Sequence, residues 1–250
     1  MTECELVQIC SYFAKYMISC GAEIHRVEDT IRRICRAYSK PRAQIYCTPA
    51  NFIITIQDRS GTPVTMSVAV GSRKTNLDRV GAYNNLSRWV CSRKPDAQSI
   101  KEKLNDINSR PVYPTTVVYA SFFLVGAAAT FAVGGGIIES LIGAVLAMLI
   151  KLINDKLNSV QASTFFKSVV SSMVISFIAV WCQSMGAVPH FDKMIIGAAT
   201  TMVPGVAITN CMRDFISGDF YSGIYSLTEA LLTAIGLAVG SGTALAAAIS

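Results

Sequence analysis

The sequence predicts an α-helical integral membrane protein of about five transmembrane helices with an N-terminal cytoplasmic α+β domain. Of its 250 residues, 52% are hydrophobic and only 15% are charged, whereas soluble globular domains carry about 25% charged residues. The charges are unevenly placed, because residues 1–110 hold 17 of the 22 Lys and Arg and 10 of the 16 Asp and Glu. These observations predict a first domain at 1–112 and a transmembrane domain at 113–250. They exclude a purely soluble enzyme, a disordered chain and a disulfide-stapled secreted protein.

The elements of the first domain follow from a change of period along the chain. Hydrophobic residues recur at helical spacing from Leu6 to Met17 and from Ile24 to Tyr38. Residues 44–48, 51–57 and 64–70 have strand patterns, and the turn signal at 58–61 predicts a hairpin from the last two. Two further helices are expected to begin at the caps Asn76 and Asp96. The predicted order is therefore two helices, three strands and two helices.

Five apolar stretches predict the transmembrane helices, since about 20 apolar residues are needed to cross a bilayer. They lie near residues 116–138, 139–153, 168–188, 194–212 and 228–249. The second is the shortest, with 11 uncharged residues between Glu139 and Lys151, and the glycines at 134–136 fit a tight connection before it. In the last stretch Gly236 and Gly240 lie four residues apart, which predicts close packing within the chain or against a partner.

The placement of Lys and Arg predicts the orientation in a cell membrane, inner or plasma. With the N-terminus in the cytoplasm, Lys193 is the only basic residue in an outside loop. Residues 1–20 lack the basic and apolar regions of a cleavable signal. The net charge of +7 over residues 1–110 suits contact with anionic membrane lipid. No nucleic-acid motif accompanies this charge, so we expect no nucleic-acid partner.

The sequence predicts no metal site, no cofactor and no catalytic residue. The eight Cys form no C-x-x-C pair and are interpreted as small core residues. The two histidines, His25 and His190, would lie on opposite sides of the membrane. Glu23, Arg26 and the charged residues around them have the spacing of ordinary helix-surface ion pairs, although Glu23 stands where a helix N-terminus could organise a site. No Walker motif is present, which disfavours ATP as the energy source.

The most informative polar region surrounds Pro204-Gly205 in the fourth predicted transmembrane helix. Proline removes a backbone hydrogen bond, so the helix should kink or break there and free backbone groups for a substrate. The candidate substrate-binding residues are Pro204, Gly205, Asn210 and Arg213, of which Arg213 suits a carboxylate. The candidates for ion coupling are the carboxylates Asp214, Asp219, Glu229 and Glu139.

These interpretations have structural alternatives. The proline and glycine could form only a packing kink in a membrane helix. Arg213 could pair with Asp214 or Asp219 at the cytoplasmic surface. Glu139 could be an interfacial side chain that reaches the headgroup region.

Two strings in the sequence resemble motifs of the threonine/serine exporter (ThrE) family. The string Gly21-Ala-Glu23-Ile-His-Arg26-Val-Glu28-Asp-Thr30 is similar to its early motif, so that Gly21, Glu23, Arg26 and Glu28 are identified as motif residues of the cytoplasmic domain. The string from Val203 to Asp219, continuing through Gly223 to Glu229-Ala230, looks like the second motif. The resemblance covers nearly all 250 residues.

The resemblance also implies an assembly and a substrate class. Full-length members carry two membrane halves on one chain, and this chain has one, which resembles the larger, YjjP-like subunit of a split two-component exporter. A smaller YjjB-like membrane subunit would then supply the missing half in a hetero-oligomer, or a homo-oligomer would form. The implied activity is export of a small carboxylate, which is threonine and serine in some members and succinate in others.

We therefore expect a subunit of a secondary-active exporter and not an enzyme. One alternative is a membrane-anchored sensor or scaffold, which predicts that Pro204 and Arg213 tolerate substitution. The other is a membrane-tethered hydrolase that uses residues 1–110, because the family's soluble domain has been viewed as hydrolase-like. No intact triad can be mapped onto this sequence, and the hydrolase would depend on His25, the only histidine in the first domain.

Overall fold

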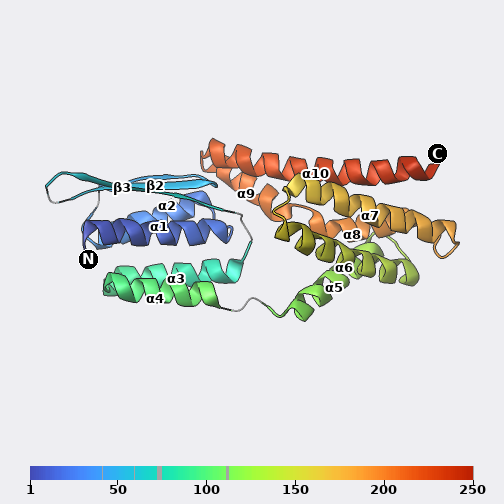
Figure 1. Ribbon diagram of the computed structural model, residues 1–250, viewed down its shortest axis with the longest axis horizontal. Helices are drawn as coiled ribbons and strands as arrows, with labels where there is room; N and C mark the ends of the chain where they lie inside the picture. The colour runs from blue at the N-terminus through green and yellow to red at the C-terminus, as the bar shows by residue number, and fades with distance from the viewer. Residues whose placement is uncertain (41, 59, 72–74, 111–112, 250) are drawn as a thin grey trace. The chain divides into compact units, whose positions relative to one another are not determined.

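The computed structural model describes residues 1–40, 42–58, 60–71, 75–110 and 113–249 (Figure 1). These residues form two compact units, which are considered separately below. The first unit contains residues 1–111 and 210–225, and the second contains residues 112–209 and 226–250. The predicted domain boundary at residue 112 lies outside the described ranges, which do not include residues 111 and 112. Residues 210–225, which the sequence assigned to the transmembrane domain, are grouped with the first unit.

The elements of the first unit occur in the predicted order. They are α1 (Glu3–Ser19), α2 (Ile24–Ala37), β1 (Gln44–Cys47), β2 (Asn51–Gln57), β3 (Pro63–Ala69), α3 (Leu77–Arg93) and α4 (Ala97–Ser109). They build three layers: α1 and α2 cover one face of the sheet, and α3 and α4 pack on the other side of these two helices (Figure 1). The middle layer therefore lies between two apolar surfaces.

Because α1 lies in this middle layer, it buries more hydrophobic residues than a single helical stripe contains. The sequence identifies a single stripe that includes Leu6, Phe13 and Met17, and all three are buried. Val7 and Ile18 are buried as well, on positions outside that stripe. A helix that lies between a sheet and a helical layer buries two faces, so one stripe underestimates its core.

The described strands form an antiparallel sheet in the order β1-β2-β3. Ile54 in the central strand lies opposite Ile45 and Met66, on the face that points to the helices. The opposite face is polar, and Thr55 and Thr65 share a hydrogen bond of 2.9 Å there. This alternation is typical of an antiparallel sheet with one solvated face. The predicted hairpin is confirmed by the pairing of β2 with β3, while residue 59 of its turn lies outside the described residues.

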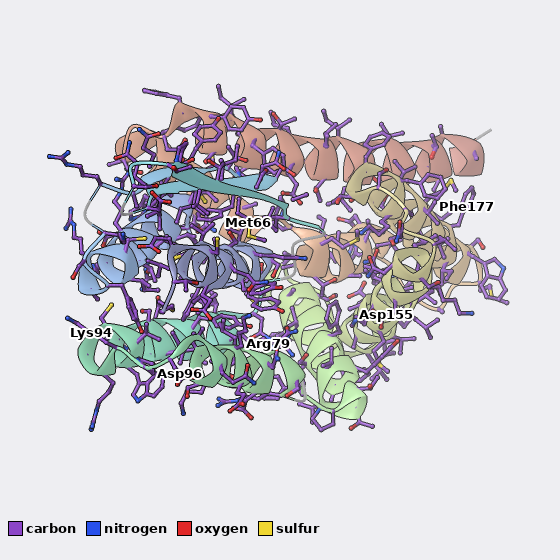
Figure 2. The ribbon with its side chains drawn as sticks, turned by 60° about the vertical axis from the view of Figure 1, so that its left-hand side comes forward. Met66, Arg79, Lys94, Asp96, Asp155 and Phe177 are labelled. Carbon is purple, nitrogen blue, oxygen red and sulfur yellow. The ribbon has the colours of Figure 1, made fainter. Side chains whose placement is uncertain are left out.

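Both predicted helix caps of α3 and α4 are confirmed. The Asn76 side chain accepts a hydrogen bond from the Arg79 N–H at 3.0 Å, and Asp96 accepts one from the Ser99 N–H at 3.3 Å. Lys94 ends α3 in a left-handed conformation, so that the chain turns back into α4 within a few residues (Figure 2). Short polar side chains at these positions satisfy the otherwise free N–H groups of a first helical turn.

The remaining helices carry the apolar stretches. They are α5 (Thr115–Ala132), α6 (Ile137–Ser159), α7 (Thr164–Ser184), α8 (Phe191–Ala199), the 3₁₀ turn η1 (Thr200–Met202), α9 (Gly205–Ile216) and α10 (Phe220–Ile249). In the described part of the chain, α5, α6, α7 and α10 are long and apolar enough to cross a membrane. The segment of α8 and η1 forms a bent pair with α9. If this pair counts as one span, the described chain has up to five spans.

The helix bounds differ from the predicted stretches, because charges do not end helices here. Predicted as residues 139–153, α6 continues to Ser159, since Lys151 and Asp155 form an ion pair one turn apart on its surface. Predicted to reach residue 138, α5 ends at Ala132 because Gly134 has a φ of +85°, which favours glycine and closes the helix. Similarly, α7 and α10 begin four and eight residues earlier than the stretches at 168 and 228.

Small residues bring the helices of the second unit together. Thr130 of α5 is fully buried, and glycines of two other helices lie against it. A Cβ atom on Gly197 of α8 would lie 2.7 Å from the Thr130 Cα, and one on Gly143 of α6 would lie 3.2 Å from its Cβ. On the other side of the unit, Gly236 and Gly240 pack against α7, as the spacing of these glycines predicts. This packing lies within the chain and is not left for a partner.

Candidate functional site

The fourth predicted transmembrane helix is broken at Pro204, as the sequence predicts. Val203 and Pro204 lie outside any helix, between the end of η1 and the start of α9 at Gly205. The helical segments on the two sides are bent by 52°. The Gly205 N–H donates to the Val203 carbonyl at 2.8 Å in place of a helical bond. Pro204 has no N–H with which to continue the helix, which explains the break.

The break leaves polar groups at the start of α9. The first N–H groups of a helix have no carbonyl partner one turn earlier, and the helix dipole makes this end favourable for an anion. Three residues before Pro204, Thr201 lines a cavity of 180 Å³ together with Ser121, Phe122 and Val125. Pockets for drug-sized ligands have roughly 300–1,000 Å³. The volume of this pocket lies below that range.

Arg213 contacts Glu23, which brings the two sequence motifs together in the first unit. The Arg213 guanidinium forms an ion pair with Glu23 Oε1, and His25 Nε2 lies 3.8 Å from the other oxygen, Oε2. The Glu23 side chain is 12% exposed, whereas Arg213 is 56% exposed. The carboxylate is thus held inside the unit, and the guanidinium keeps donors directed to solvent. This partner lies 190 positions before Arg213, outside the segment in which the sequence offered Asp214 and Asp219 as partners.

Glu28, a second carboxylate of the early motif, is affected by the charge of Asp219 in the second motif. Burial raises the pKa of the Glu28 carboxyl above its ordinary value of 4.5, and the negative charge of Asp219 raises this pKa further. Arg32, one turn later on α2, and a backbone hydrogen bond from Cys47 lower it in part. The charge of Asp219 therefore favours the protonated form of Glu28. Two interactions thus join the motifs, the ion pair of Glu23 with Arg213 and the electrostatic effect of Asp219 on Glu28, and these four residues are called the motif cluster.

This effect predicts a pH dependence of stability that Glu28→Gln should remove. A carboxyl whose pKa is raised by folding stabilises the fold fully below 4.5, and the contribution is lost as the pH rises through the folded-state pKa. We expect Glu28→Gln to be at least as stable as the wild type near neutral pH and less dependent on pH above 4.5. Thermal unfolding of the full chain from acid to neutral pH measures this, with the exposed Glu102→Gln as the control. The same change of the unfolding temperature with pH in Glu28→Gln and the wild type would contradict this prediction.

The backbone of the second motif positions Asp219 between two helices. Gly218 ends α9 with a φ of +85°, and the next N–H, of Asp219, donates to the Asp214 carbonyl at 2.9 Å. The Asp219 side chain then accepts a hydrogen bond from the Ser222 N–H at 3.1 Å and so caps α10. Four residues after Asp219, a Cβ on Gly223 would lie 2.7 Å from the ring of Phe215. The motif's glycines therefore permit a tight turn and a close helix contact.

We expect Gly218→Ala to destabilise the protein by about 1–2 kcal/mol, because alanine is strained in the left-handed conformation. The matched control is Gly81→Ala in α3, where the added methyl meets no atom within 4 Å and should stabilise by about 0.5–1 kcal/mol. Denaturant unfolding of the full chain, monitored by circular dichroism, compares the two. An unchanged unfolding midpoint for Gly218→Ala would show that the turn does not need glycine.

The other predicted site residues are distributed over both units. Gly205 and Arg213 are eight residues apart on α9, about 12 Å along the helix, so they do not share one contact. Asn210 is half-buried on that helix, and Asp214 is 4% exposed. In the second unit, Glu229 is half-buried on α10. Among the early-motif residues, Gly21 lies in the turn between α1 and α2, and Arg26 lies on the exposed side of α2.

Glu139 is buried and accepts two backbone hydrogen bonds. Its Oε2 accepts from the Gly136 N–H at the start of α6, and its Oε1 accepts from the His190 N–H at 3.0 Å, just before α8. At 4% exposure, it does not point out to the headgroups, as its interfacial alternative requires. A carboxylate at the start of a helix is stabilised by the free N–H groups there.

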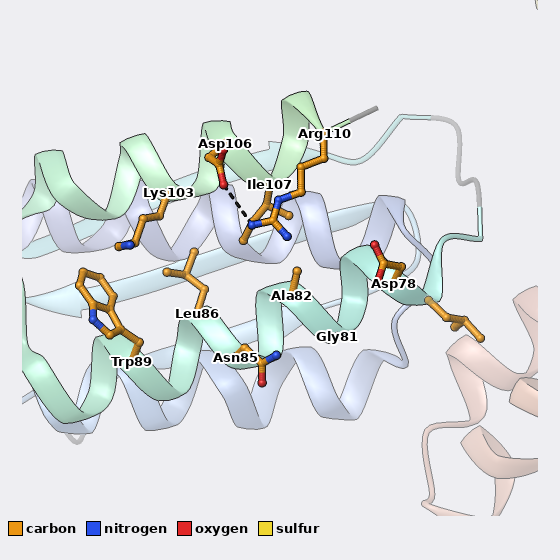
Figure 3. Close-up of a pocket in the computed structure, with 11 residues that line it drawn as sticks. Asp78, Gly81, Ala82, Asn85, Leu86, Trp89, Lys103, Asp106, Ile107 and Arg110 are labelled. Atoms are coloured by element: carbon orange, nitrogen blue, oxygen red, sulfur yellow. Dashed lines mark hydrogen bonds and ion pairs between the residues drawn. The ribbon is translucent and has the colours of Figure 1, made fainter. Parts of the chain in front are cut away.

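A separate groove of 570 Å³ lies between α3 and α4 (Figure 3). Lys103 lies 4.8 Å from the centre of the Trp89 ring, and Arg110 pairs with Asp106 at 3.1 Å. No predicted site residue lines this groove, as far as the described residues show. Nor do the described residues contain a group of three or more His, Cys, Asp or Glu that could hold a metal ion.

The pairing of Glu23 with Arg213 is the feature that reasoning from the sequence missed. The two residues belong to the two strings that resemble family motifs, and their charges are opposite. Opposite charges in the two motifs were thus the signal in the sequence that could have indicated this pairing. Spacing rules for ion pairs apply within a helix, so they gave only local partners.

Comparison with known proteins gives the same family for nearly the whole chain. The family model described as "Putative threonine/serine exporter" (ThrE) matches residues 8–248. A protein of Mycobacterium tuberculosis, named "Probable threonine/serine exporter", is 22% identical over 229 residues, which are 91% of this chain and 43% of that protein. The "Threonine/serine exporter" of Corynebacterium glutamicum is 22% identical over 238 residues, which are 90% of this chain and 48% of that protein.

The chain thus spans less than half the length of these curated relatives. No solved structure shows a significant match to it. The apolar helices agree with the family, since four or five of them are able to cross a membrane. Because the family model covers residues 8–248, this multi-pass α-helical membrane protein belongs to the threonine/serine exporter (ThrE) family.

Proposed function

We propose that this chain is a subunit of a secondary-active exporter of small carboxylate-bearing metabolites. The observation that carries the proposal is the ion pair of Arg213 with Glu23, which joins both family motifs through an exposed guanidinium. A guanidinium already held by a carboxylate has the geometry to bind a second carboxylate in exchange. The names of the two relatives favour threonine and serine as substrates, and succinate is the alternative that the same chemistry admits.

In the proposed mechanism, the substrate carboxylate competes with Glu23 for Arg213 at the cytoplasmic side. Asn210, one turn before Arg213 on α9, orients the substrate by its amide. Further along the pathway, the free N–H groups at the start of α9 after Pro204 receive the carboxylate. These are two separate positions on one helix, and the cavity lined by Thr201 lies near the second.

Coupling to an ion is assigned to carboxylates. Asp219 is the favoured candidate, because its negative charge acts on Glu28 of the early motif, and protonation of Glu28 would relieve this repulsion. Asp214 and Glu229 are the further candidates. For Glu139, the two backbone hydrogen bonds favour a capping role over proton transfer.

The proposed assembly has the first unit in the cytoplasm and a smaller YjjB-like membrane subunit as the partner. The length of the relatives supports this, since each is about twice as long as the segment that this chain matches. The basic charge of residues 1–110 supports the orientation. The hydrolase alternative gains no support from His25, which in the described residues contacts Glu23 and no serine, threonine or cysteine hydroxyl or thiol.

Efflux from cells preloaded with labelled threonine or labelled succinate tests the proposal. Cells would express this chain alone, this chain with a YjjB-like subunit, or neither. We expect partner-dependent efflux of one label, which identifies the substrate. If neither label leaves faster while both proteins are confirmed in the membrane, the exporter proposal fails and the sensor or scaffold alternative takes its place.

A further inference from the structure

A groove between α2 and α3 in the first unit has four arginines among the residues that line it. Its volume is 780 Å³, within the range of roughly 300–1,000 Å³ for ligand pockets. Arg26, Arg33 and Arg36 line it from α2, and Arg88 lines it from α3. On α2 these residues are 7 and 3 positions apart, which places them on one side of the helix over about 15 Å.

Most of this positive charge is not neutralised within the described chain. The carboxylate in the groove, Asp29, pairs with Arg33 at 2.6 Å. Arg88 contacts the neutral amide of Asn85, and Arg26 and Arg36 form no ion pair with any described residue. Like charges that converge on one concavity repel each other, and a bound anion removes this repulsion.

The guanidinium groups are the main donors of the groove for phosphate oxygens. Thr30 adds a hydroxyl group to the lining, whereas the hydroxyls of Ser87 and Ser92 donate to the carbonyls of Asn84 and Trp89. Guanidinium binds phosphate through two parallel N–H···O bonds, which is why arginine rather than lysine marks phosphate sites. On a basic helix face that only contacts solvent, lysine would be as suitable as arginine. No lysine lines this groove.

We propose that this groove is a binding site for a ligand with two or more phosphate groups. The arginines are spread along α2 over a greater length than a single phosphate group can contact. An extended polyphosphate, or a lipid headgroup with two phosphates, therefore fits the site. The source is either a soluble polyphosphate or a lipid such as cardiolipin, which share this chemistry. None of Glu23, Glu28, Arg213 and Asp219 lines the groove, and the proposal does not rest on the transport function.

The test uses the full chain in detergent with two probes. Inorganic tripolyphosphate is titrated by calorimetry at low and high salt, and cardiolipin binding is compared with phosphatidylcholine by native mass spectrometry. The variants are Arg26→Gln/Arg36→Gln, which removes the two arginines without an ion pair, and Arg88→Gln on the facing helix. Arg42→Gln, an exposed arginine before β1, is the control for loss of charge.

We expect one probe to bind the wild type and the control, and to lose at least about tenfold in affinity in both groove variants, as loss of one charge-assisted contact requires. Tripolyphosphate binding assigns a soluble ligand, and selective cardiolipin binding assigns a lipid. Arg26→Lys/Arg36→Lys should bind more weakly than the wild type, because lysine keeps the charge but loses the paired donors. Equal losses in Arg42→Gln and the groove variants, or no binding of either probe, would overturn the proposal. Circular dichroism shows that each variant is folded.

Discussion

Arg213→Gln is expected to reduce export by roughly one to two orders of magnitude, since a hydrogen bond to a charged group contributes about 1.5–3 kcal/mol. The change also leaves the Glu23 carboxylate, which is 12% exposed, without its ion pair, at a cost of about 1–3 kcal/mol in stability, so thermal unfolding of the variant is measured alongside export. The initial rate of efflux, with the amount of protein in the membrane quantified, measures the effect. Arg110→Gln is the control for loss of an exposed guanidinium, since Arg110 is 54% exposed and pairs with the exposed Asp106.

Two variants of the partner residue separate substrate binding from a structural ion pair. Glu23→Gln removes the competitor of the substrate, so the KM for export should fall. Exchange of the charges in Glu23→Arg/Arg213→Glu restores an ion pair but places a carboxylate where the substrate needs a cation, so export should stay low. Full activity of the exchanged pair would show that Arg213 acts only through Glu23, and the proposed substrate role would be wrong.

Gly197→Ala should disrupt the second unit by about 1–3 kcal/mol, and export should be lost with it. The added methyl would lie 2.7 Å from the backbone N and Cα of Thr130, and backbone atoms cannot rotate away. Gly242→Ala in α10, where the methyl meets no atom within 4 Å, is the control. Thermal unfolding in detergent measures both variants.

A second glycine beside Thr130 makes this prediction specific. At Gly143 the added methyl meets the Thr130 side chain, so Thr130→Ala should restore most of the stability lost in Gly143→Ala. The same change should rescue Gly197→Ala less well, because it removes the clash with the Thr130 Oγ1 atom but leaves the clash with the Thr130 backbone at 2.7 Å. Equal rescue of both variants, or rescue of neither, would contradict the packing seen around Thr130.

The sequence predicts local features of this protein well. The caps Asn76 and Asp96, the hairpin between β2 and β3 and the break at Pro204 all follow from the preferences of a few neighbouring residues. Helix ends were less accurate, because Lys151 and Asp155 pair on the surface of α6 and so let it continue past them. A charge count along the chain does not contain such pairs.

Features that depend on tertiary contacts were not predicted. Nothing in the period of α1 shows that it is covered on two sides, and the contact of Thr130 with Gly143 and Gly197 joins three helices. The ion pair of Glu23 with Arg213 likewise crosses 190 positions. For the candidate site, the residues and their chemistry therefore remain a prediction from the sequence, and the structure adds that Glu23 and Arg213 contact each other.

The length of α10 has a consequence for the surrounding lipid. Its 30 residues extend over about 45 Å, while the hydrocarbon core of a bilayer is about 30 Å thick. Tyr221 and Tyr225 are exposed in its first two turns, and tyrosine favours the headgroup region. The helix must then tilt or extend its first turns beyond the hydrocarbon to relieve the hydrophobic mismatch. Bilayer thickness thereby becomes a determinant of how deep the Asp219 cap lies, and membranes that differ in thickness should differ in the activity they support.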